Sequence, residues 1–396
     1  MDLEKRILLF LFLSSIVFGF SLTILPAYLS SIGFTPLEYG LLNAIRSISG
    51  LLGALATGVV VDYIGSLPMV IASLSLCAIG FGLMSIPSST AIFVGATMLS
   101  LGGSAQHVSM DVFLSRSFDV EKYEAVYSKT YSVILIGSSV GGFAGWIPTL
   151  IGKSTSIVSR YSYSLAIASL LLLATLLPLY GTRERYSVRA RKTLIASLKG
   201  FRDVCKGVAL YLLIAEFIVS LGASMSVRMA GFYFAKKFNV QSNALGTMNG
   251  VTNLLMAGLA ALSPRISASV GHPIAAYILM CASSIPLLVA LTYAPSFAIA
   301  AGIYVARSAL MNAASPLYTA FTMRVVPSDV RGKISSAMIL IGVAGAFVGS
   351  IIGGVLMNKD LDAPFRVTAA IHAFYLVFLY AFVVRKSGKR ITFYRA

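Results

Sequence analysis

Charged residues are scarce in this sequence. They make up 11% of its 396 residues, while hydrophobic residues make up 57%. Soluble domains carry about 25% charged residues, so this composition excludes a soluble protein of this length and predicts a membrane protein.

Cysteines are few and scattered. Cys77 and Cys281 lie in apolar runs, Cys205 lies in a basic segment, and none belongs to a Cys-x-x-Cys pair. The sequence therefore indicates neither a disulfide framework nor a metal site. It also lacks a Walker-type P-loop and a His-Glu-x-x-His or paired-aspartate motif. We therefore expect neither direct use of ATP nor an enzyme, and no cofactor.

Long apolar runs fill most of the chain. A helix needs about 20 apolar residues to cross a hydrocarbon core of about 30 Å. Twelve such runs are present, at 7–31, 38–61, 68–87, 91–115, 128–152, 162–180, 208–235, 243–263, 273–293, 297–321, 334–357 and 364–384. They are about twice as long as a barrel strand of ~10 residues and do not alternate in polarity. The sequence therefore predicts an all-α membrane protein with twelve transmembrane helices.

The second half of the sequence repeats the order of the first. Three landmarks recur 206 positions later, so that Gly40, Asn43 and Gly65 match Gly246, Asn249 and Gly271. The tetrapeptide Ile134–Gly137 recurs as Ile339–Gly342. A duplicated six-span unit is typical of transporters. We expect two six-helix bundles related by a pseudo-twofold axis, 1–180 and 208–396, joined by a basic linker, 181–207.

The formal net charge of +17 would fit a nucleic-acid-binding protein, but the distribution of the basic residues indicates membrane topology instead. When both termini are placed on one side, 22 of the 31 Lys and Arg residues fall on that side and six on the other. Basic loops stay in the cytoplasm, so we expect a cell-membrane protein with both termini inside. The basic face, including the tail after residue 384, would contact anionic lipids, and no nucleic-acid partner is expected.

The linker is too basic to cross the membrane. Between Thr193 and Phe201 its apolar residues recur at steps of three and four, which favours a short amphipathic helix on the inner surface over a flexible linker. The remaining loops are short, so no domain outside the membrane is available for soluble catalysis.

The loop after the second run carries a motif. Gly58, Asp62 and Gly65 match the Gly, Asp and second Gly of the loop between helices two and three of the major facilitator superfamily. Tyr63, Ser66 and Leu67 stand where that family usually has basic residues, and Ala268 stands at the position of the Asp in the second half. The stretch 327–332, Pro-Ser-Asp-Val-Arg-Gly, is similar to the family's loop before helix eleven.

The resemblance to this superfamily covers essentially the whole chain. It implies two six-helix bundles around a central cavity that opens alternately to each side of the membrane. Spans one, four, seven and ten, with spans two, five, eight and eleven, would line or gate this cavity. Spans three, six, nine and twelve would lie outside. We also expect a monomer.

Span five contains a glycine motif. The stretch 137–142, Gly-Ser-Ser-Val-Gly-Gly, is similar to the Gly-Pro-x-x-Gly-Gly motif of the drug/proton antiporters of the superfamily, with Ser138 in place of proline. Glycines in membrane helices also serve close packing, so a packing role and an antiporter role both stay open.

Several residues are candidates for gating. The resemblance points to Gly58, Asp62, Gly65, Arg331, Gly137, Gly141 and Gly142. Because an anion is stabilised at a helix N-terminus, we expect Asp62 to cap the N-terminus of span eleven or to pair with Arg331.

Few ionisable residues lie within the predicted spans. A charged side chain near the centre of a bilayer costs about 2.5–3.5 kcal/mol on insertion scales, so each one marks a cavity or a paired partner. Counting about 1.5 Å of rise per residue, Arg46, Arg307 and Glu216 lie near the midplane. Arg228 lies closer to the outer face. The excess of arginine over glutamate favours an anionic or amphipathic substrate.

Glu216 is the best candidate for a proton carrier. A carboxyl group in a low-dielectric cavity can exchange a proton near neutral pH unless an arginine holds it ionised. The alternative is that Arg307 or Arg46 pairs permanently with Glu216, which would make these residues a structural clamp.

His107 and Asp111 are a second candidate for proton coupling. They are four residues apart and so share one face of span four. The alternative is a structural pair at the inner interface that also faces Arg116. His372, on the predicted outer span twelve, is expected to be a packing residue.

Uncharged polar residues add hydrogen-bonding capacity within the spans. The candidates for substrate binding are Asn43, Asn249, Asn253, Gln106, Asn312 and Tyr28, beside Arg46, Arg307 and Arg228. Each could equally bridge two helices. Trp146, near the outer end of span five, is expected to be an interfacial anchor.

These observations favour a secondary active transporter of a small organic solute, coupled to protons and working by alternating access. The span-five motif favours export by antiport. The alternative is a proton-coupled symporter or a uniporter that imports an organic anion held by Arg46 and Arg307. A channel or a receptor would not explain the duplication.

Overall fold

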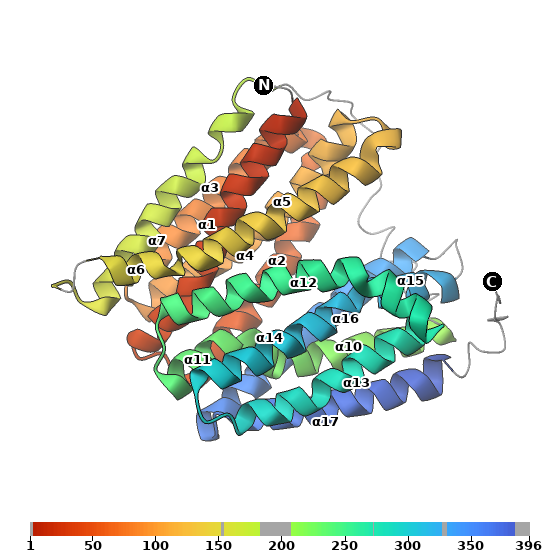
Figure 1. Ribbon diagram of the computed structural model, residues 1–396. Coiled ribbons are helices and arrows are strands. Elements are labelled where there is room, and N and C mark those ends of the chain that lie inside the picture. The colour runs from red at the N-terminus through yellow and green to blue at the C-terminus, as the bar shows by residue number, and fades with distance from the viewer. Residues whose placement is uncertain (1–2, 152–153, 183–206, 272, 327–330, 385–396) are drawn as a thin grey trace. The chain divides into compact units, whose positions relative to one another are not determined.

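The computed structural model describes residues 3–151, 154–182, 207–271, 273–326 and 331–384 (Figure 1). Within these ranges the chain forms helices and no strand, which confirms the all-α prediction for them. The predicted surface helix between Thr193 and Phe201 and the basic tail lie outside the described residues.

In the described residues, the first half contains six long helices and one short one: α1 (Leu3–Ser31), α2 (Pro36–Ile64), α3 (Ser66–Met84), α4 (Ser89–Ser117), α5 (Tyr123–Phe143), α6 (Ile147–Leu150) and α7 (Ile157–Ala174). The second half contains α10 (Val208–Ser226), α11 (Ala230–Phe238), α12 (Ser242–Val270), α13 (Pro273–Thr292), α14 (Phe297–Ala313), α15 (Ser315–Val325), α16 (Arg331–Lys359) and α17 (Ala363–Phe378). Short turns join α5 to α6, α10 to α11 and α14 to α15, so the two helices of each pair together correspond to one predicted span.

Ten helical segments in the described ranges are long and apolar enough to cross a membrane. The other two predicted spans correspond to α4 and α12, which are each 29 residues long. These two helices carry more polar side chains, including Gln106 and His107 on α4 and Asn249 and Asn253 on α12. A multi-pass membrane protein is therefore confirmed, while a total of twelve spans stays a prediction.

The helices group into two compact units. Among the described residues, the first unit contains 3–182 and Gly231–Leu254, and the second contains 207–230 and 255–384. The grouping differs from the predicted bundles, 1–180 and 208–396, in the segment Gly231–Leu254. That segment, which contains most of α11 and the first part of α12, packs with helices of the first half.

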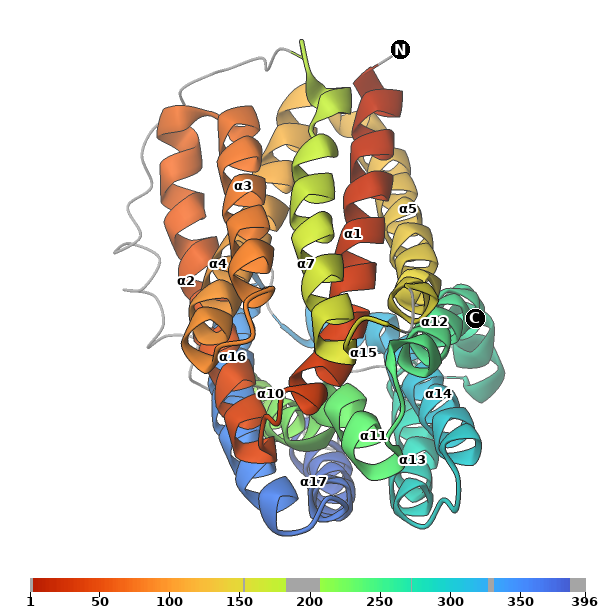
Figure 2. The same cartoon turned by 90° about the vertical axis from the view of Figure 1, so that its left-hand side faces the viewer.

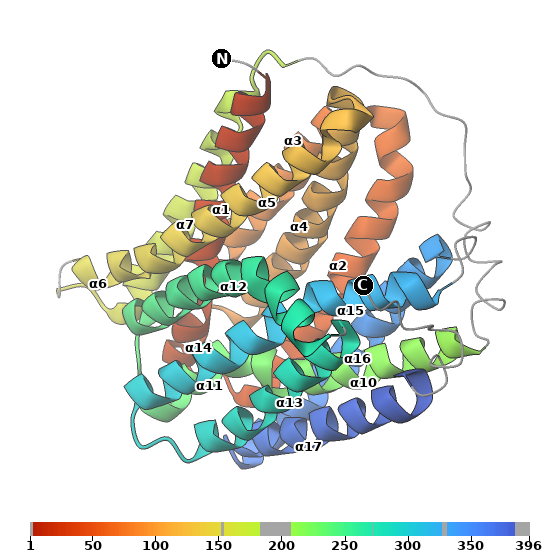
Figure 3. The ribbon, with the colours of Figure 1, turned by 45° about the vertical axis from the view of Figure 1, so that its right-hand side comes forward.

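Four pairs of spans pack against each other in the same way in both halves. In the first unit α1 packs against α5 and α7, and α3 packs against α4 and α7 (Figure 2). In the second unit α10 packs against α16 and α17, and α13 packs against α14 and α17 (Figure 3). In span order these are pairs 1–5, 1–6, 3–4 and 3–6 and their equivalents six spans later. The packing therefore supports the duplication read from the sequence.

Two matching glycines end equivalent helices. Gly65 follows α2 with a φ of 98°, and Gly271 follows α12 with a φ of 82°. Both values lie in the left-handed region that favours glycine. Gly65 therefore has a backbone reason for its place in the loop motif. Gly58 has no such requirement, because a Cβ added there would meet nothing within 4 Å.

The repeated tetrapeptide ends in a glycine that lets two helices approach. A Cβ added at Gly137 on α5 would lie 2.8 Å from the backbone oxygen of Phe12 on α1. A Cβ added at Gly342 on α16 would lie 3.1 Å from Oε1 of Glu216 on α10. The fifth span of each half thus packs against the first span at the same position, but in the second half it meets a carboxylate.

Helix α4 offers a test of this close packing. A Cβ added at Gly102 would lie 2.6 Å from the backbone oxygen of Ser73 on α3, whereas one added at the adjacent Gly103 would meet nothing within 4 Å. We expect Gly102→Ala to destabilise the protein by about 1–3 kcal/mol through overpacking. Gly103→Ala, a favourable exchange within a helix, is expected to leave stability unchanged or slightly higher. Thermal unfolding of both variants in detergent measures the difference, and equal melting temperatures would contradict it.

Candidate functional site

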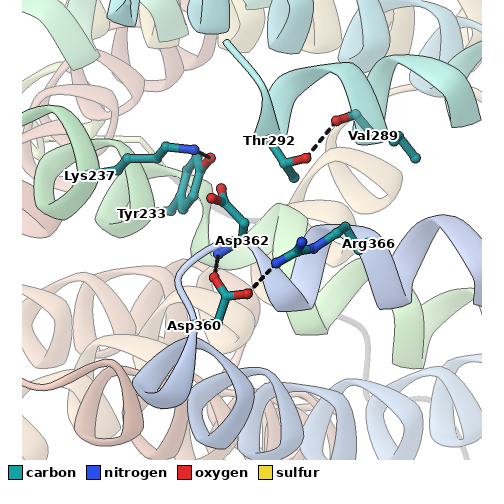
Figure 4. Close-up of polar contacts among 7 residues, drawn as sticks. All are labelled: Tyr233, Lys237, Val289, Thr292, Asp360, Asp362 and Arg366. Atoms are coloured by element: carbon teal, nitrogen blue, oxygen red, sulfur yellow. Dashed lines mark hydrogen bonds and ion pairs between the residues drawn. The ribbon is translucent and has the colours of Figure 1, made fainter. Parts of the chain in front are cut away.

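Ion pairs in the described residues lie near helix ends. Arg116 Nη2 is 2.8 Å from Asp62 Oδ1, and Lys129 Nζ is 2.7 Å from Glu4 Oε1. Arg366 pairs with Asp360 in the loop between α16 and α17, where Asp360 Oδ1 also accepts a hydrogen bond from the backbone N–H of Asp362 at 2.9 Å (Figure 4). These pairs fix the ends of helices, where water can reach them.

Asp62 has a partner that sequence reasoning did not assign to it. Its carboxylate pairs with Arg116 at the end of α4, a helix that packs against α2. Arg331 belongs to the second unit, where its Nε donates to the backbone oxygen of Val326 at 3.3 Å. A pair between Asp62 and Arg331, or a cap on span eleven, stays a prediction. His107 and Asp111 are both exposed on α4.

Glu216 is partly buried on α10, in the second unit. Its Oε1 accepts a hydrogen bond from Ser220 at 3.2 Å and faces Gly342 of α16. Arg307 belongs to the same unit, yet neither Glu216 nor Arg307 forms an ion pair with any residue that the structure describes. The alternative in which Arg307 clamps Glu216 is therefore not formed in this structure.

Two buried tyrosines, Tyr277 and Tyr375, and the partly buried Tyr318 form a tyrosine cluster beside Glu216. Tyr318 on α15 lies close enough to interact electrostatically with Glu216, and its hydroxyl has no hydrogen-bond partner of ordinary geometry among the described residues. The ring of Tyr277 stacks on that of Tyr318 at 5.0 Å, and the hydroxyls of Tyr277 and Tyr375 are 2.7 Å apart. Sequence reasoning missed this cluster because single tyrosines in apolar runs carry no distinctive signal.

Arg307 is buried inside its helix bundle, with 2% of its surface exposed. Its guanidinium lies near Tyr304, near Cys281 of α13 and near His372 of α17. The resemblance placed α13 and α17, which are spans nine and twelve, outside the cavity. The side chain of Arg307 therefore points toward the interior of its own bundle, and its role as a substrate contact stays a prediction.

Arg46 lies on α2 in the first unit. Its Nε donates to Ser100 Oγ of α4 at 3.4 Å, and it forms no ion pair with a residue in the described part of the chain. Arg228 is exposed, in the short turn between α10 and α11. Gln106 is buried on α4, and Asn253 is partly buried on α12.

The other polar candidates use their side chains in contacts within or between helices. Nδ2 of Asn43 donates to Tyr39 O at 3.0 Å, Nδ2 of Asn312 to Ser308 O at 2.8 Å and Nδ2 of Asn249 to Thr23 Oγ1 at 3.4 Å, and the hydroxyl of Tyr28 accepts from Ser162 at 3.5 Å. The bonds of Asn249 and Tyr28 join two helices and fit the helix-bridging alternative, whereas those of Asn43 and Asn312 stay within one helix. Whether any of these groups also contacts a substrate stays a prediction.

The span-five glycines pack against two different helices of the first unit. A Cβ added at Gly141 would lie 2.2 Å from the backbone oxygen of Ile16 on α1. Gly142 faces α12, where a Cβ added at Gly246 would lie 2.2 Å from the oxygen of Gly142. All three glycines of the motif, Gly137, Gly141 and Gly142, thus have a packing contact.

We call the contact of α5 with the first part of α12 the α5–α12 crossing, formed by Gly142, Gly145, Ser242 and Gly246. Ser242 Oγ donates to the backbone oxygen of Gly145 at 2.7 Å. Just beyond, Nε1 of Trp146 donates to Thr247 Oγ1 at 3.0 Å. Trp146 therefore has a specific partner as well as the exposed position expected of an interfacial anchor.

Comparison with known proteins decides the family. The family model of the Major Facilitator Superfamily matches residues 7–350. The chain belongs to this superfamily. The superfamily prediction is thereby confirmed, and the protein is a membrane transporter and not an enzyme. A search of curated proteins found no match.

Solved transporter structures share the superfamily fold with this chain. The nucleoside transporter NupG is 14% identical, with a TM-score of 0.74 over 97% of this chain and 99% of that one. A bacterial homologue of the iron transporter ferroportin is 14% identical, with a TM-score of 0.76 over 97% and 100%. The xylose transporter XylE from E. coli is 12% identical, with a TM-score of 0.72 over 96% of each chain. At such identities the likeness concerns the fold alone.

Proposed function

We propose that this member of the superfamily is a proton-coupled secondary transporter of a small organic solute, working by alternating access. The observation that carries the proposal is that the deep side chains Glu216 and Arg307 form no ion pair with any described residue. Intramembrane charges are retained where they handle ions or substrates, because their burial is costly. The ion pairs among the described residues lie instead near helix ends.

Glu216 is the proposed proton carrier. Its carboxyl group accepts a hydrogen bond from Ser220, faces Gly342 and has no fixed cation beside it among the described residues. A carboxyl group that no fixed cation holds ionised can bind and release a proton. Opening to alternate sides of the membrane would then load and release one proton.

Two directions of coupling follow from different residues. Export in exchange for protons rests on the span-five motif, whose glycines all have packing contacts. Uptake of an organic anion together with protons rests on Arg46 and Arg307, for which no acidic partner is present among the described residues. Export by antiport is the first candidate. We propose uptake of an organic anion as the alternative function, because Arg46 and Arg307 could hold the anionic group of such a solute.

The setting of the transporter follows from its basic loops. We propose a monomer in the cell membrane with both termini in the cytoplasm and anionic lipids against its basic inner face. The transporter then binds the solute and protons in each transport cycle.

A thermal-shift screen of small organic solutes at an acidic and an alkaline pH tests this proposal. A solute that binds the folded protein raises its apparent melting temperature. We expect the shift produced by the true solute to depend on pH, since proton and solute binding are linked. Solute shifts that are the same at both pH values would count against proton coupling.

A further inference from the structure

Arg307, His372 and Ser308 form a buried polar group, which we call the Arg307 cluster. Arg307 and His372 each have 2% of their surface exposed, and Ser308 has 3%. Arg307 Nε and both ring nitrogens of His372 are buried without a hydrogen-bond partner among the described residues. The buried hydroxyl of Ser308 lies beside that of Tyr304 but not in ordinary hydrogen-bond geometry. The backbone of Val219 lies near the imidazole but not in hydrogen-bond geometry.

No acidic side chain among the described residues pairs with the buried charge of Arg307. An arginine side chain stays protonated in proteins, so its charge cannot be removed by loss of a proton. A buried charge is tolerated when it is paired and hydrogen-bonded. Tyr304 and Cys281, which lie near the guanidinium, are neutral groups, and Glu216 does not pair with Arg307. The cluster therefore has donors for an anion that the described residues do not supply.

The imidazole is held firmly in place. A Cβ added at Gly222 on α10 would lie 3.0 Å from Cδ2 of His372, so the ring lies directly on the backbone of α10. Thr368, one turn earlier on α17, donates its hydroxyl to the oxygen of Gly222 at 2.9 Å. These contacts fix the orientation of His372 toward Arg307 before any ligand arrives.

We propose that the Arg307 cluster binds an oxyanion, a carboxylate or a phosphate, among the helices of the second unit. The planar guanidinium offers paired N–H donors that match such a group. A neutral imidazole adds one N–H donor and the serine adds a hydroxyl. The ligand class is then a small organic acid, a phosphate ester or inorganic phosphate.

The competing interpretation is internal. A neutral His372 could accept a hydrogen bond from Arg307 after a small shift of either side chain, and the pair would then only tie α14 to α17. Under that interpretation the cluster binds no anion, and replacement of either residue changes stability alone.

Anion binding by the purified full-length protein separates the two. The melting temperature is measured with inorganic phosphate and, separately, with acetate, each against sodium chloride of equal ionic strength. We expect at least one of the two anions to give a saturable rise of about 2 °C or more. The anion that acts distinguishes a phosphate from a carboxylate ligand.

Variants assign the effect to the cluster. Arg307→Gln is expected to abolish the anion-dependent rise, while the same exchange at the exposed Arg324 leaves it intact. Arg307→Lys keeps the positive charge but lacks the planar pair of N–H donors, so this variant should retain part of the anion-dependent rise in melting temperature. His372→Leu should weaken the rise more than His372→Gln, which keeps a donor. No saturable rise with either anion, or the same rise in Arg307→Gln, would overturn the proposal.

This readout is independent of transport. If an anion raises the melting temperature through Arg307 but transport does not respond to a pH gradient, proton coupling is excluded and the anion site is supported. If a pH gradient drives transport but no anion binds at Arg307, the anion site is excluded and the proposed proton-coupled transport is supported. Should Arg307→Gln not fold, the comparison of Arg307→Lys with wild type still decides the question.

Discussion

Glu216→Gln abolishes gradient-driven accumulation of the solute while solute exchange continues. Glutamine keeps the size of the side chain and a hydrogen bond to Ser220, but it cannot bind and release a proton. The neutral side chain also imitates the protonated form, so the helices can still rearrange. Accumulation by reconstituted Glu216→Gln is expected to fall to the level of protein-free liposomes, whereas exchange of labelled against unlabelled solute proceeds at a rate similar to wild type.

The control for this variant is Glu121→Gln, at an exposed glutamate next to α5. It should accumulate solute normally. Accumulation by Glu216→Gln at the wild-type level would exclude Glu216 as the proton carrier. Loss of both accumulation and exchange would indicate a structural role instead.

Gly246→Val stops transport without preventing folding. A Cβ at Gly246 would lie 2.2 Å from the backbone oxygen of Gly142, so no side chain fits while the α5–α12 crossing is formed. The crossing joins span five of one sequence half to span eight of the other, and the proposed alternating access would require such contacts to form and break in each cycle. Valine therefore removes the state in which the crossing is closed.

A matched control lies on the same helix. A Cβ added at Gly258 would meet nothing within 4 Å, so Gly258→Val carries the same helix penalty without the clash. Solute uptake into proteoliposomes and the yield of monodisperse protein should be measured for both variants. Equal uptake by the two would contradict a role for the crossing in the cycle.

The arrangement of spans could be predicted because its signals are local. Apolar length locates the helices, and the matched glycines Gly65 and Gly271 mark equivalent helix ends, where both adopt positive φ. The tetrapeptides 134–137 and 339–342 likewise mark the same packing of span five on span one in each half. Each of these features depends on a few neighbouring residues, so a single sequence shows it.

The partners of the charged residues could not be predicted. Spans that are apolar on all sides have no amphipathic pattern from which the buried face of a helix can be read. The direction in which the side chain of Arg307 points could therefore not be predicted. His372 was expected to be a packing residue, and only the structure brings it beside Arg307. The pairing of Asp62 with Arg116 depends in the same way on the packing of α2 against α4.

Solute accumulation under an imposed pH gradient tests proton-coupled transport most directly. The purified protein is reconstituted into liposomes, and uptake of a solute found in the thermal-shift screen is followed with the interior more acidic, more alkaline or equal in pH to the outside. We predict accumulation with one sign of the gradient that disappears on addition of a protonophore. An alkaline interior would drive symport, and an acidic interior would drive antiport. Solute uptake that is the same under all three conditions would contradict proton coupling.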